Sequence, residues 1–338
     1  MFGVNITDYD RKVYEDKLRD FLPDKMIDVH VHLWEPGMRH ARQKGCVGWT
    51  QIVAPSQTYE DMEESYRQLF PDKKIAKIVM GSPSCDLDVV NAYIKKCIDA
   101  HGNKAYYCTN WDTTPEEIQK ALDSGFIGIK PYQNNSPSYI PANELRIFDF
   151  LTHEQMEYMD SIGGIVMLHI PRAQRLRDPI NIAQMLELDE RYPNARVIIA
   201  HIGRAYVERD LGDAFEILKN TKHLMFDFSA NVFDHAMEQC INAVGTKRIM
   251  FGSDMPFTKM RMYRIDDNGT YINMVPRGLY GDVSDDKNMR ETDETDITTF
   301  MYEELLAFRR TVEKLGLSRS DVEDMMYNNA SAFYGIKL

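Results

Sequence analysis

Short apolar runs rich in β-branched residues alternate along most of the chain with longer stretches of helical periodicity. The apolar runs predict strands at 25–32, 75–82, 104–110, 126–131, 164–170, 196–202, 224–229 and 248–253. The periodic stretches predict helices at 57–70, 86–100, 114–124, 143–161, 178–191, 210–219 and 231–244. Proline follows a capping side chain at Thr114-Pro115 and at Asp178-Pro179, which is typical of the first turn of a helix.

This alternation favours a parallel sheet with right-handed helical crossovers. Eight such units predict a closed (β/α)8 TIM barrel, and 338 residues fit one such domain covering 1–338. The first strand is not followed by a G-x-G-x-x-G turn, which argues against an open dinucleotide-binding sheet. Residues 7–22 mix apolar and charged positions, so the N-terminal segment 1–24 is expected to place a helix outside the barrel.

Two connections are unusually long, at 35–56 after the first strand and at 256–296 after the last. In the second, Asp266-Asp267-Asn268-Gly269 separates two alternating runs, which predicts a β-hairpin. An excursion at this end of a strand lies over the active face of a barrel, so we expect 256–296 to be a lid or a dimer contact. Its acidic part, 285–296, is expected to be a solvated loop.

Composition narrows the possible partners. The net charge of −12 argues against nucleic acid, although local arginines can still bind a small anionic substrate. No apolar run approaches the roughly 20 residues of a membrane-spanning helix, and the charged N-terminus lacks the apolar core of a secretory signal. The five cysteines are scattered and form no C-x-x-C pair, so we expect a reducing cytoplasm and no disulfide framework.

Histidines and an aspartate stand at the ends of four predicted strands. His30 and His32 lie one residue apart on the first strand, where alternation points both side chains the same way. His169 ends the fifth strand, His201 the sixth and Asp254 the eighth. In a barrel the carboxyl ends of all strands converge on one mouth, so these residues are expected to share one pocket.

Imidazoles and a carboxylate in one pocket suit a first-row divalent cation with a position left open for water. A single histidine after an apolar strand is more often a packed, hydrogen-bonded residue than a ligand. The coincidence at four strand ends instead predicts a metal site, with one zinc ion preferred and manganese as the alternative. Bound there, the metal would acidify a water molecule and polarise a substrate carbonyl.

This arrangement resembles the amidohydrolase superfamily, in the amidohydrolase-related branch that also contains decarboxylases and hydratases. The resemblance rests on Asp28-Val29-His30-Val31-His32, His169, His201-Ile202-Gly203-Arg204, Gly252-Ser253-Asp254-Met255-Pro256 and the closing segment 328–335. It implies that His30, His32, His169 and Asp254 bind one metal. It also implies that His201 orients the water or transfers a proton, and that Asp254 can accept one.

Lys130, near the end of the fourth strand, leaves the number of metals open. Some members of the superfamily carry a carbamylated lysine there that bridges two metals, and His201 would then be a ligand. In the amidohydrolase-related branch a lysine at this strand commonly stands beside a single metal. We therefore expect one metal, with Lys130 close to the substrate.

Two arginines follow the strand-end histidines at the same offset, Arg172 after His169 and Arg204 after His201. Their guanidinium groups can bind a substrate carboxylate through two hydrogen bonds, and Arg204 is the first candidate. The alternative is a salt bridge with one of the many acidic side chains. Trp34 is a further candidate for the pocket wall, although aromatic residues near strand ends often serve packing.

The leading functional hypothesis is a metal-dependent hydrolase that cleaves an amide, lactone or related C–N or C–O bond in a small carboxylate-bearing compound. The alternative is a lyase, either a non-oxidative decarboxylase or a hydratase, built on the same mononuclear site. A non-catalytic binding protein is the least favoured, since every expected ligand position is filled. A homodimer is possible for a barrel of this kind.

Overall fold

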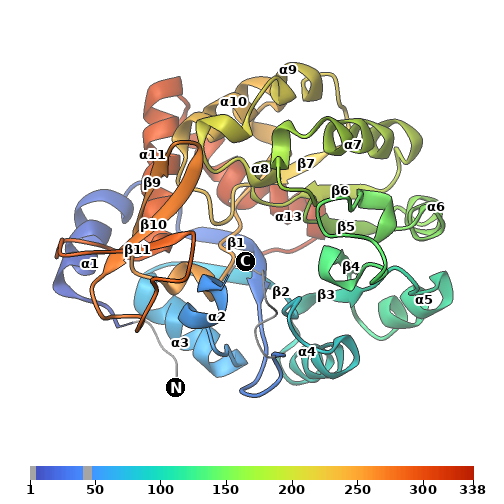
Figure 1. Cartoon of the computed structure of the whole chain (residues 1–338), viewed down its shortest axis with the longest axis horizontal. Helices are drawn as coiled ribbons and strands as arrows, with labels where there is room; N and C mark the ends of the chain where they lie inside the picture. Colours follow the sequence, from blue (N-terminus) through green and yellow to red (C-terminus); the bar gives the residue numbers. More distant parts are fainter. Residues whose placement is uncertain (1–4, 41–47) are drawn as a thin grey trace.

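The computed structural model describes residues 5–40 and 48–338, and eight parallel strands lie at its centre in sequential order. Helices surround the strands, which confirms the (β/α)8 barrel (Figure 1). All eight predicted strands are present. They are β1 (Lys25–His32), β2 (Lys74–Met80), β3 (Lys104–Thr109), β4 (Gly128–Pro131), β5 (Ile165–Leu168), β6 (Arg196–Ile199), β7 (Met225–Asp227) and β8 (Ile249–Met250).

The predicted helices are also present, and most begin at a capping side chain. They are α3 (Tyr59–Leu69), α4 (Leu87–His101), α5 (Pro115–Asp123), α6 (His153–Ser161), α7 (Pro179–Arg191), α9 (Ala214–Leu218) and α10 (Asp234–Val244). The prediction of a helix over 143–161 is wrong in its first half. The Thr152 side chain caps α6 by accepting from the backbone N–H of Gln155, so the helix begins there, and 143–152 holds only a 3₁₀ turn at Ile147–Asp149.

The barrel closes between its first and last strands through a few backbone hydrogen bonds rather than a full ladder. Val29 N–H donates to Phe251 O (3.1 Å), Asp254 N–H to His30 O (2.8 Å) and His32 N–H to Met255 O (2.7 Å). We call this junction the β1–β8 seam. The residues that cross it include those predicted to bind metal, so closure of the barrel and assembly of the site involve the same backbone.

Apolar side chains fill the barrel on both sides of the sheet. Inside, Ile27, Val29, Met167, Ile198 and other strand residues form one buried cluster. Ala330 of α13 (Asn329–Tyr334) belongs to the same cluster, so the C-terminal helix closes one end of the barrel. A larger cluster joins the outer face of the strands to the surrounding helices, which include α11 (Phe300–Leu315). The strands are therefore buried on both faces, as parallel barrels require.

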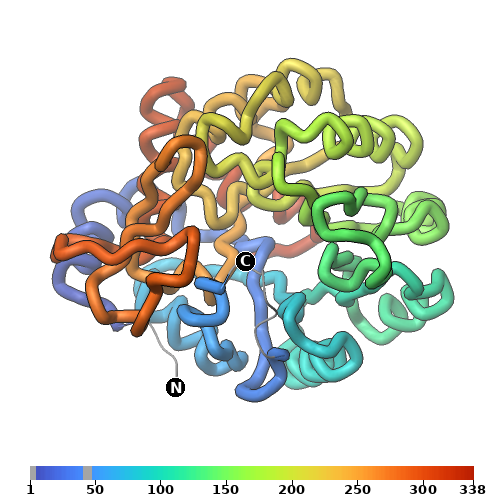
Figure 2. Tube along the Cα trace, viewed as in Figure 1, coloured from blue at the N-terminus to red at the C-terminus, as the bar shows by residue number. Residues whose placement is uncertain are grey.

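The connection after β8 forms a small sheet of its own. The predicted hairpin is confirmed as β9 (Tyr263–Asp267) and β10 (Thr270–Pro276), paired antiparallel around Asn268-Gly269. The expectation of a solvated loop over 285–296 is wrong in part, because β11 (Met289–Thr292) pairs parallel with β10. Figure 2 shows this insertion as the orange segment that lies over one side of the barrel. The third strand is held at the edge of β10 by this backbone pairing.

The N-terminal helix α1 (Asp8–Val13) continues into a π-helical turn at Tyr14–Leu18 and packs outside the barrel. Residues 1–4 of that segment and residues 41–47 of the 35–56 connection, with Cys46, lie outside the described residues. Within the described residues, Cys85, Cys97, Cys108 and Cys240 are free and buried. None of the described helices is long and apolar enough to cross a membrane.

Candidate metal centre

The histidines of β1 and the aspartate after β8 meet across the β1–β8 seam. Asp254 Oδ1 lies 3.1 Å from His32 Nε2 and 3.7 Å from His30 Nε2. The His30 and His32 rings are 5.1 Å apart, so the two side chains do point the same way. Both imidazoles are almost completely buried, whereas the Asp254 side chain is 13% exposed. The three potential ligand atoms thus converge at a site that solvent can still reach.

The other nitrogen of each imidazole is held by an acceptor. His30 Nδ1 lies 2.9 Å from Asp227 Oδ2, and His32 Nδ1 lies 2.9 Å from the carbonyl oxygen of Gly81. Since a carboxylate and a carbonyl only accept, each Nδ1 carries the proton and each Nε2 has its lone pair free. Metal-binding histidines are commonly oriented in this way.

These protonation states make the cluster a good fit for a cation. Two Nε2 lone pairs and a carboxylate oxygen face one another, and three acceptors this close repel unless a positive charge lies between them. Burial, reinforced by the Lys130 charge, lowers the pKa of His30 to about 3, so an imidazolium does not supply that charge. Zn²⁺ and similar ions bind this set of nitrogen and oxygen donors.

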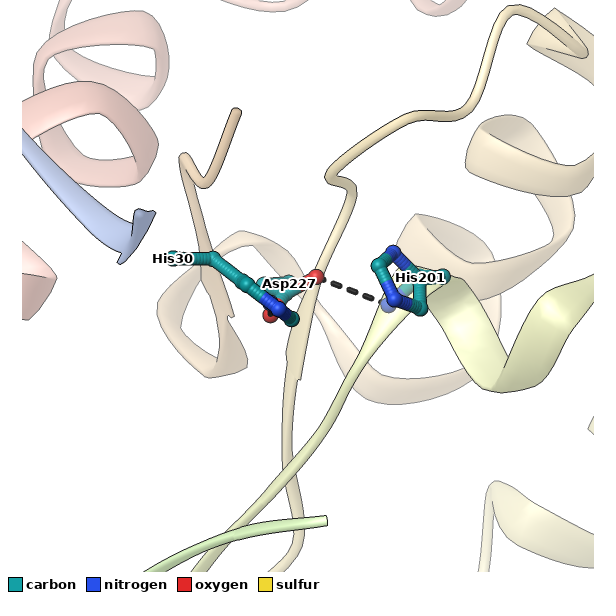
Figure 3. Close-up of side chains that lie close together, drawn as sticks. All are labelled: His30, His201 and Asp227. Atoms are coloured by element: carbon teal, nitrogen blue, oxygen red, sulfur yellow. Dashed lines mark hydrogen bonds and ion pairs between the residues drawn. The ribbon is translucent and has the colours of Figure 1, made fainter. Parts of the chain in front are cut away.

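Asp227 supports two of the histidines at once (Figure 3). While Oδ2 accepts from His30, Oδ1 accepts from the backbone N–H of His201 (2.7 Å) and from the Ser229 hydroxyl (2.5 Å). The resulting contacts, above all the interaction with His30, hold the pKa of this buried carboxyl well below its usual range despite the opposing effect of burial. His30, His201 and Asp227 also form a compact group of potential ligands, but hydrogen bonds already occupy both Asp227 oxygens. This group therefore positions the site rather than forming a second one.

His201 lies in an unusual turn. Four successive residues, His201–Arg204, have positive φ angles between 49° and 65° and form the short element α8. Such left-handed backbone costs about 1–2 kcal/mol for each residue other than glycine. His201 Nδ1 donates to the carbonyl oxygen of Ser229 (2.9 Å), and its backbone N–H donates to Asp227, so both ends of the residue are fixed. The remaining Nε2 lone pair is free, and burial lowers the pKa of His201.

Close backbone approach explains one glycine of the site. A Cβ atom at Gly252, just after β8, would lie 2.9 Å from His30 Cβ and 3.3 Å from Ser229 Cβ. Any side chain there would push β1 away from β8. The glycine in Gly252-Ser253-Asp254 thus allows the aspartate strand to approach the histidine strand.

His169 and Lys130 lie near this group but have different environments. The His169 ring is 5.4 Å from the His201 ring. Among the described residues, two groups of three potential ligands have all their ligand atoms within 4.8 Å of one another, and His169 belongs to neither group. Its role as a ligand stays a prediction. Lys130 Nζ is buried and has no hydrogen-bond partner within the described ranges. Burial lowers the pKa of Lys130 to about 8, against the opposing influence of Asp227 and Asp254.

The other predicted substrate-binding residues already have protein partners. Arg204 donates through one terminal nitrogen to the carbonyl oxygens of residues 170, 171 and 172, at 3.3, 3.2 and 2.9 Å. Arg172 pairs with Asp178 at 2.9 Å. Trp34 is fully buried, donates to Pro55 O and stacks on Phe257. All three stabilise the loops around the mouth, and their contact with substrate stays a prediction.

Asp227 was missed by the sequence reasoning, although a signal for it exists. It interrupts the apolar segment Met225-Phe226-Asp227-Phe228 at the end of a predicted strand, as Asp254 ends the next strand. A carboxylate there is costly to bury without partners, so it marks a built polar site. Asp28 carries the same signal at β1, where its carboxylate accepts from the Tyr66 hydroxyl and from Ser253 N–H (3.0 Å).

Comparisons with known proteins agree with this fold. Solved structures of similar fold include a probable 2-pyrone-4,6-dicarboxylic acid hydrolase from Acinetobacter baumannii with bound citric acid (15% identity, TM-score 0.57, 92% of this chain and 99% of that chain). A zinc-bound amidohydrolase from Burkholderia multivorans has 12% identity and a TM-score of 0.59 over 92% of this chain and 99% of that chain. A manganese-bound dihydroxybenzoic acid decarboxylase from Polaromonas has 12% identity and a TM-score of 0.56 over 93% of this chain and 97% of that chain.

A search of curated proteins found no match. The sequence profile of the amidohydrolase family matches residues 27–269, which is more than half of the chain and runs from the third residue of β1 through β9. The matched segment includes every histidine and aspartate of the metal centre described above. The chain therefore belongs to the amidohydrolase family.

Proposed function

We propose that this protein is a metal-dependent hydrolase that cleaves an amide, lactone or related bond in a small carboxylate-bearing substrate. The observation that carries the proposal is the convergence of His30 Nε2, His32 Nε2 and Asp254 Oδ1, three acceptors whose geometry calls for a cation. His169 is the proposed fourth ligand. Zinc is the proposed ion and manganese the alternative, and one ion of each kind is named among the similar structures.

The side chains around the proposed metal have distinct roles in catalysis. A divalent cation held at this site supplies Lewis acidity, which lowers the pKa of water and polarises a carbonyl. His201 is neutral with a free Nε2, so it can take a proton from the attacking water and return it to the leaving group. The carbonyl oxygen of Ser229 keeps His201 in that tautomer, and Asp227 holds the backbone N–H of His201. Asp254, partly exposed at the mouth, is a second proton acceptor.

A lyase is the second candidate. The same ligands and the same neutral His201 could assist protonation at carbon, and two of the similar structures are named as decarboxylases. Lys130 favours this alternative in one respect, because a buried amine with a pKa of about 8 can hold or release a proton near neutral pH. A non-catalytic binding protein remains the least favoured hypothesis, and a homodimer through 256–296 stays a prediction.

Metal content and product analysis together test the proposal. Protein purified without added chelator should contain about one zinc or manganese per chain, and His30→Ala with His32→Ala should lose it. We expect the loaded enzyme to hydrolyse members of a panel of lactones and N-acyl amino acids and to lose turnover with dipicolinate, with recovery on adding zinc. Carbon dioxide release from aromatic acids without hydrolysis would select the lyase. Two metals per chain would favour the alternative in which a carbamylated Lys130 bridges them.

A further inference from the structure

Three arginines and two tyrosines gather beside the metal centre, where the hairpin meets the segments after β5 and β6. We call Arg175, Arg204, Arg264, Tyr206 and Tyr271 the arginine–tyrosine cluster. The guanidinium carbon of Arg264 lies 4.6 Å from the Tyr271 ring centre and 5.1 Å from that of Tyr206, and the guanidinium carbon of Arg175 lies 4.9 and 5.3 Å from the same two rings. The two rings meet edge to face at 5.3 Å. The cluster thus joins the insertion to the barrel.

The positive charge of this cluster is only partly neutralised. Asp210 pairs with Arg175 at 2.6 Å and also accepts from the backbone N–H groups of residues 206 and 207. Arg264 donates only to neutral groups, Asn273 Oδ1 (3.0 Å) and Ala230 O (3.1 Å), and forms no ion pair within the described residues. Burial, together with the Arg175 charge, lowers the pKa of Arg264 to about 10. An arginine without a carboxylate partner is unexpected in a chain of net charge −12, where acidic side chains are in excess.

Unused donors point to an acceptor that the chain itself does not supply. Arg175 Nε and Asn273 Nδ2 are buried and have no hydrogen-bond partner in the described parts of the chain. Buried donors without partners are rare because each costs about 1–3 kcal/mol. Arg175 is a member of the cluster and Asn273 accepts from Arg264, so an anion bound at the cluster could accept from both residues.

The cluster borders the metal centre on the side of His201. The Tyr206 ring lies 6.4 Å from the His201 ring. Burial lowers the pKa of His169, and the positive charge of Arg204 lowers it further. The side chain of Arg175 is 15% exposed, so an anion at the mouth has a route to it. A substrate with one end at the metal would therefore bring its other end to these residues.

We infer that the arginine–tyrosine cluster binds a carboxylate of the substrate other than the group that reacts at the metal, with Arg264 as its main ligand and Arg175 and Asn273 as further donors. This inference rests on the proposed function and names its substrate class, a compound with a carboxylate distal to the reacting bond. It assigns to the hairpin a specificity role. It also replaces Arg172 and Arg204, whose donors already serve Asp178 and backbone carbonyls, as the principal carboxylate ligands.

The experiment compares flexible diacids with their half-esters. Succinate, glutarate and adipate, each paired with its monomethyl ester, are titrated into zinc-loaded protein by calorimetry. In the wild type, the best diacid should bind about tenfold or more tightly than its half-ester, as expected for charge-assisted bonds to arginine. Arg264→Met should abolish this preference while leaving zinc content unchanged. The matched control is Arg290→Met, because Arg290 is an exposed arginine of the same small sheet, paired with Asp267.

Several results would overturn the inference. These are no diacid preference in the wild type, an unchanged preference in Arg264→Met, or an equal loss in the Arg290→Met control. If Arg264→Met fails to fold, Arg264→Lys carries the test, because lysine cannot present the planar fork and should lose part of the preference. A folded Arg264→Lys protein with full preference would also count against it. Failure of the proposed function looks different, since absent turnover in zinc-loaded protein leaves the diacid preference measurable.

Discussion

Asp227 is the residue on which the geometry of the centre depends most. It accepts from His30 Nδ1 with one oxygen and from His201 N–H and Ser229 with the other. In Asp227→Asn, the amide NH₂ must face at least one of these donors, so either His30 or His201 loses its orientation. We expect zinc affinity to fall about 10- to 100-fold, the usual cost of losing a carboxylate behind a metal-bound histidine.

Competition with a chromophoric chelator measures this change directly. Asp112→Asn serves as the control, because Asp112 is exposed in the loop after β3 and its carboxylate makes no contact with the site. Unchanged zinc affinity in Asp227→Asn would mean that the orientation of His30 comes from packing alone.

Single residues also mark where sequence reasoning succeeds. His30, His32, His201 and Asp254 were predictable because the barrel brings strand ends together, whatever their separation in sequence. Arg175 and Arg264 were not predictable as a pair. Arg175 lies in a 3₁₀ turn after β5 and Arg264 lies on β9, and their proximity depends on how the hairpin docks onto the segment after β5, which no local pattern encodes.

Among the elements, α1 and the insertion after β8 are linked by one buried ion pair. Asp10 of α1 is fully buried, and its two oxygens accept from Arg261 at 2.6 and 3.0 Å and from the Thr298 hydroxyl at 2.7 Å. Asp10→Asn leaves the Arg261 guanidinium, whose side chain is only 15% exposed, without its carboxylate. We expect the free energy of unfolding to fall by about 3 kcal/mol.

The same pair predicts a pH dependence. Burial acts to raise the pKa of Asp10, but the Arg261 and threonine hydrogen bonds outweigh it, so the pKa lies below its ordinary value of 3.8. A carboxyl with a lowered folded-state pKa stabilises the protein above its unfolded pKa and loses this effect as pH falls through the folded one. The stability gap between wild type and Asp10→Asn should therefore be full near neutral pH and shrink below about pH 4.

Urea unfolding at a series of pH values gives this gap. Asp8→Asn is the matched control, since Asp8 is an exposed acid on the same helix and pairs only with exposed Arg11. A constant gap across the acid range would contradict the role of Asp10 ionisation.

The elements themselves were predicted well, and the two errors have different causes. Strands buried on both faces give continuous apolar runs that are easy to recognise. The helix prediction over 143–161 starts too early, because the helix begins only after the N-cap residue Thr152. β11 was missed because its segment is acidic and only its contact with β10 makes it a strand. Tertiary pairing decided the second case, and no local propensity could have replaced it.

On the scale of the whole molecule, the metal centre coincides with the place where the barrel closes. His30 and His32 come from the first strand and Asp254 from the segment after the last, and the β1–β8 seam between them has few backbone hydrogen bonds. A cation bound by both sides would hold the seam shut. Local opening of the seam then requires release of the metal, which links hydrogen exchange there to metal occupancy.

Hydrogen exchange with and without zinc should therefore change most at the seam. We expect the amides of Val29, His32 and Asp254 to exchange up to about a thousandfold more slowly when free zinc exceeds its dissociation constant a thousandfold. The amides of α5, on the outside of the barrel (Figure 1), provide the internal reference. Equal protection of the seam in the two states would show that apolar packing alone closes the barrel. Slowing at the seam that is about 10- to 100-fold smaller in Asp227→Asn than in wild type at the same zinc concentration would tie the effect to the support that Asp227 gives the site.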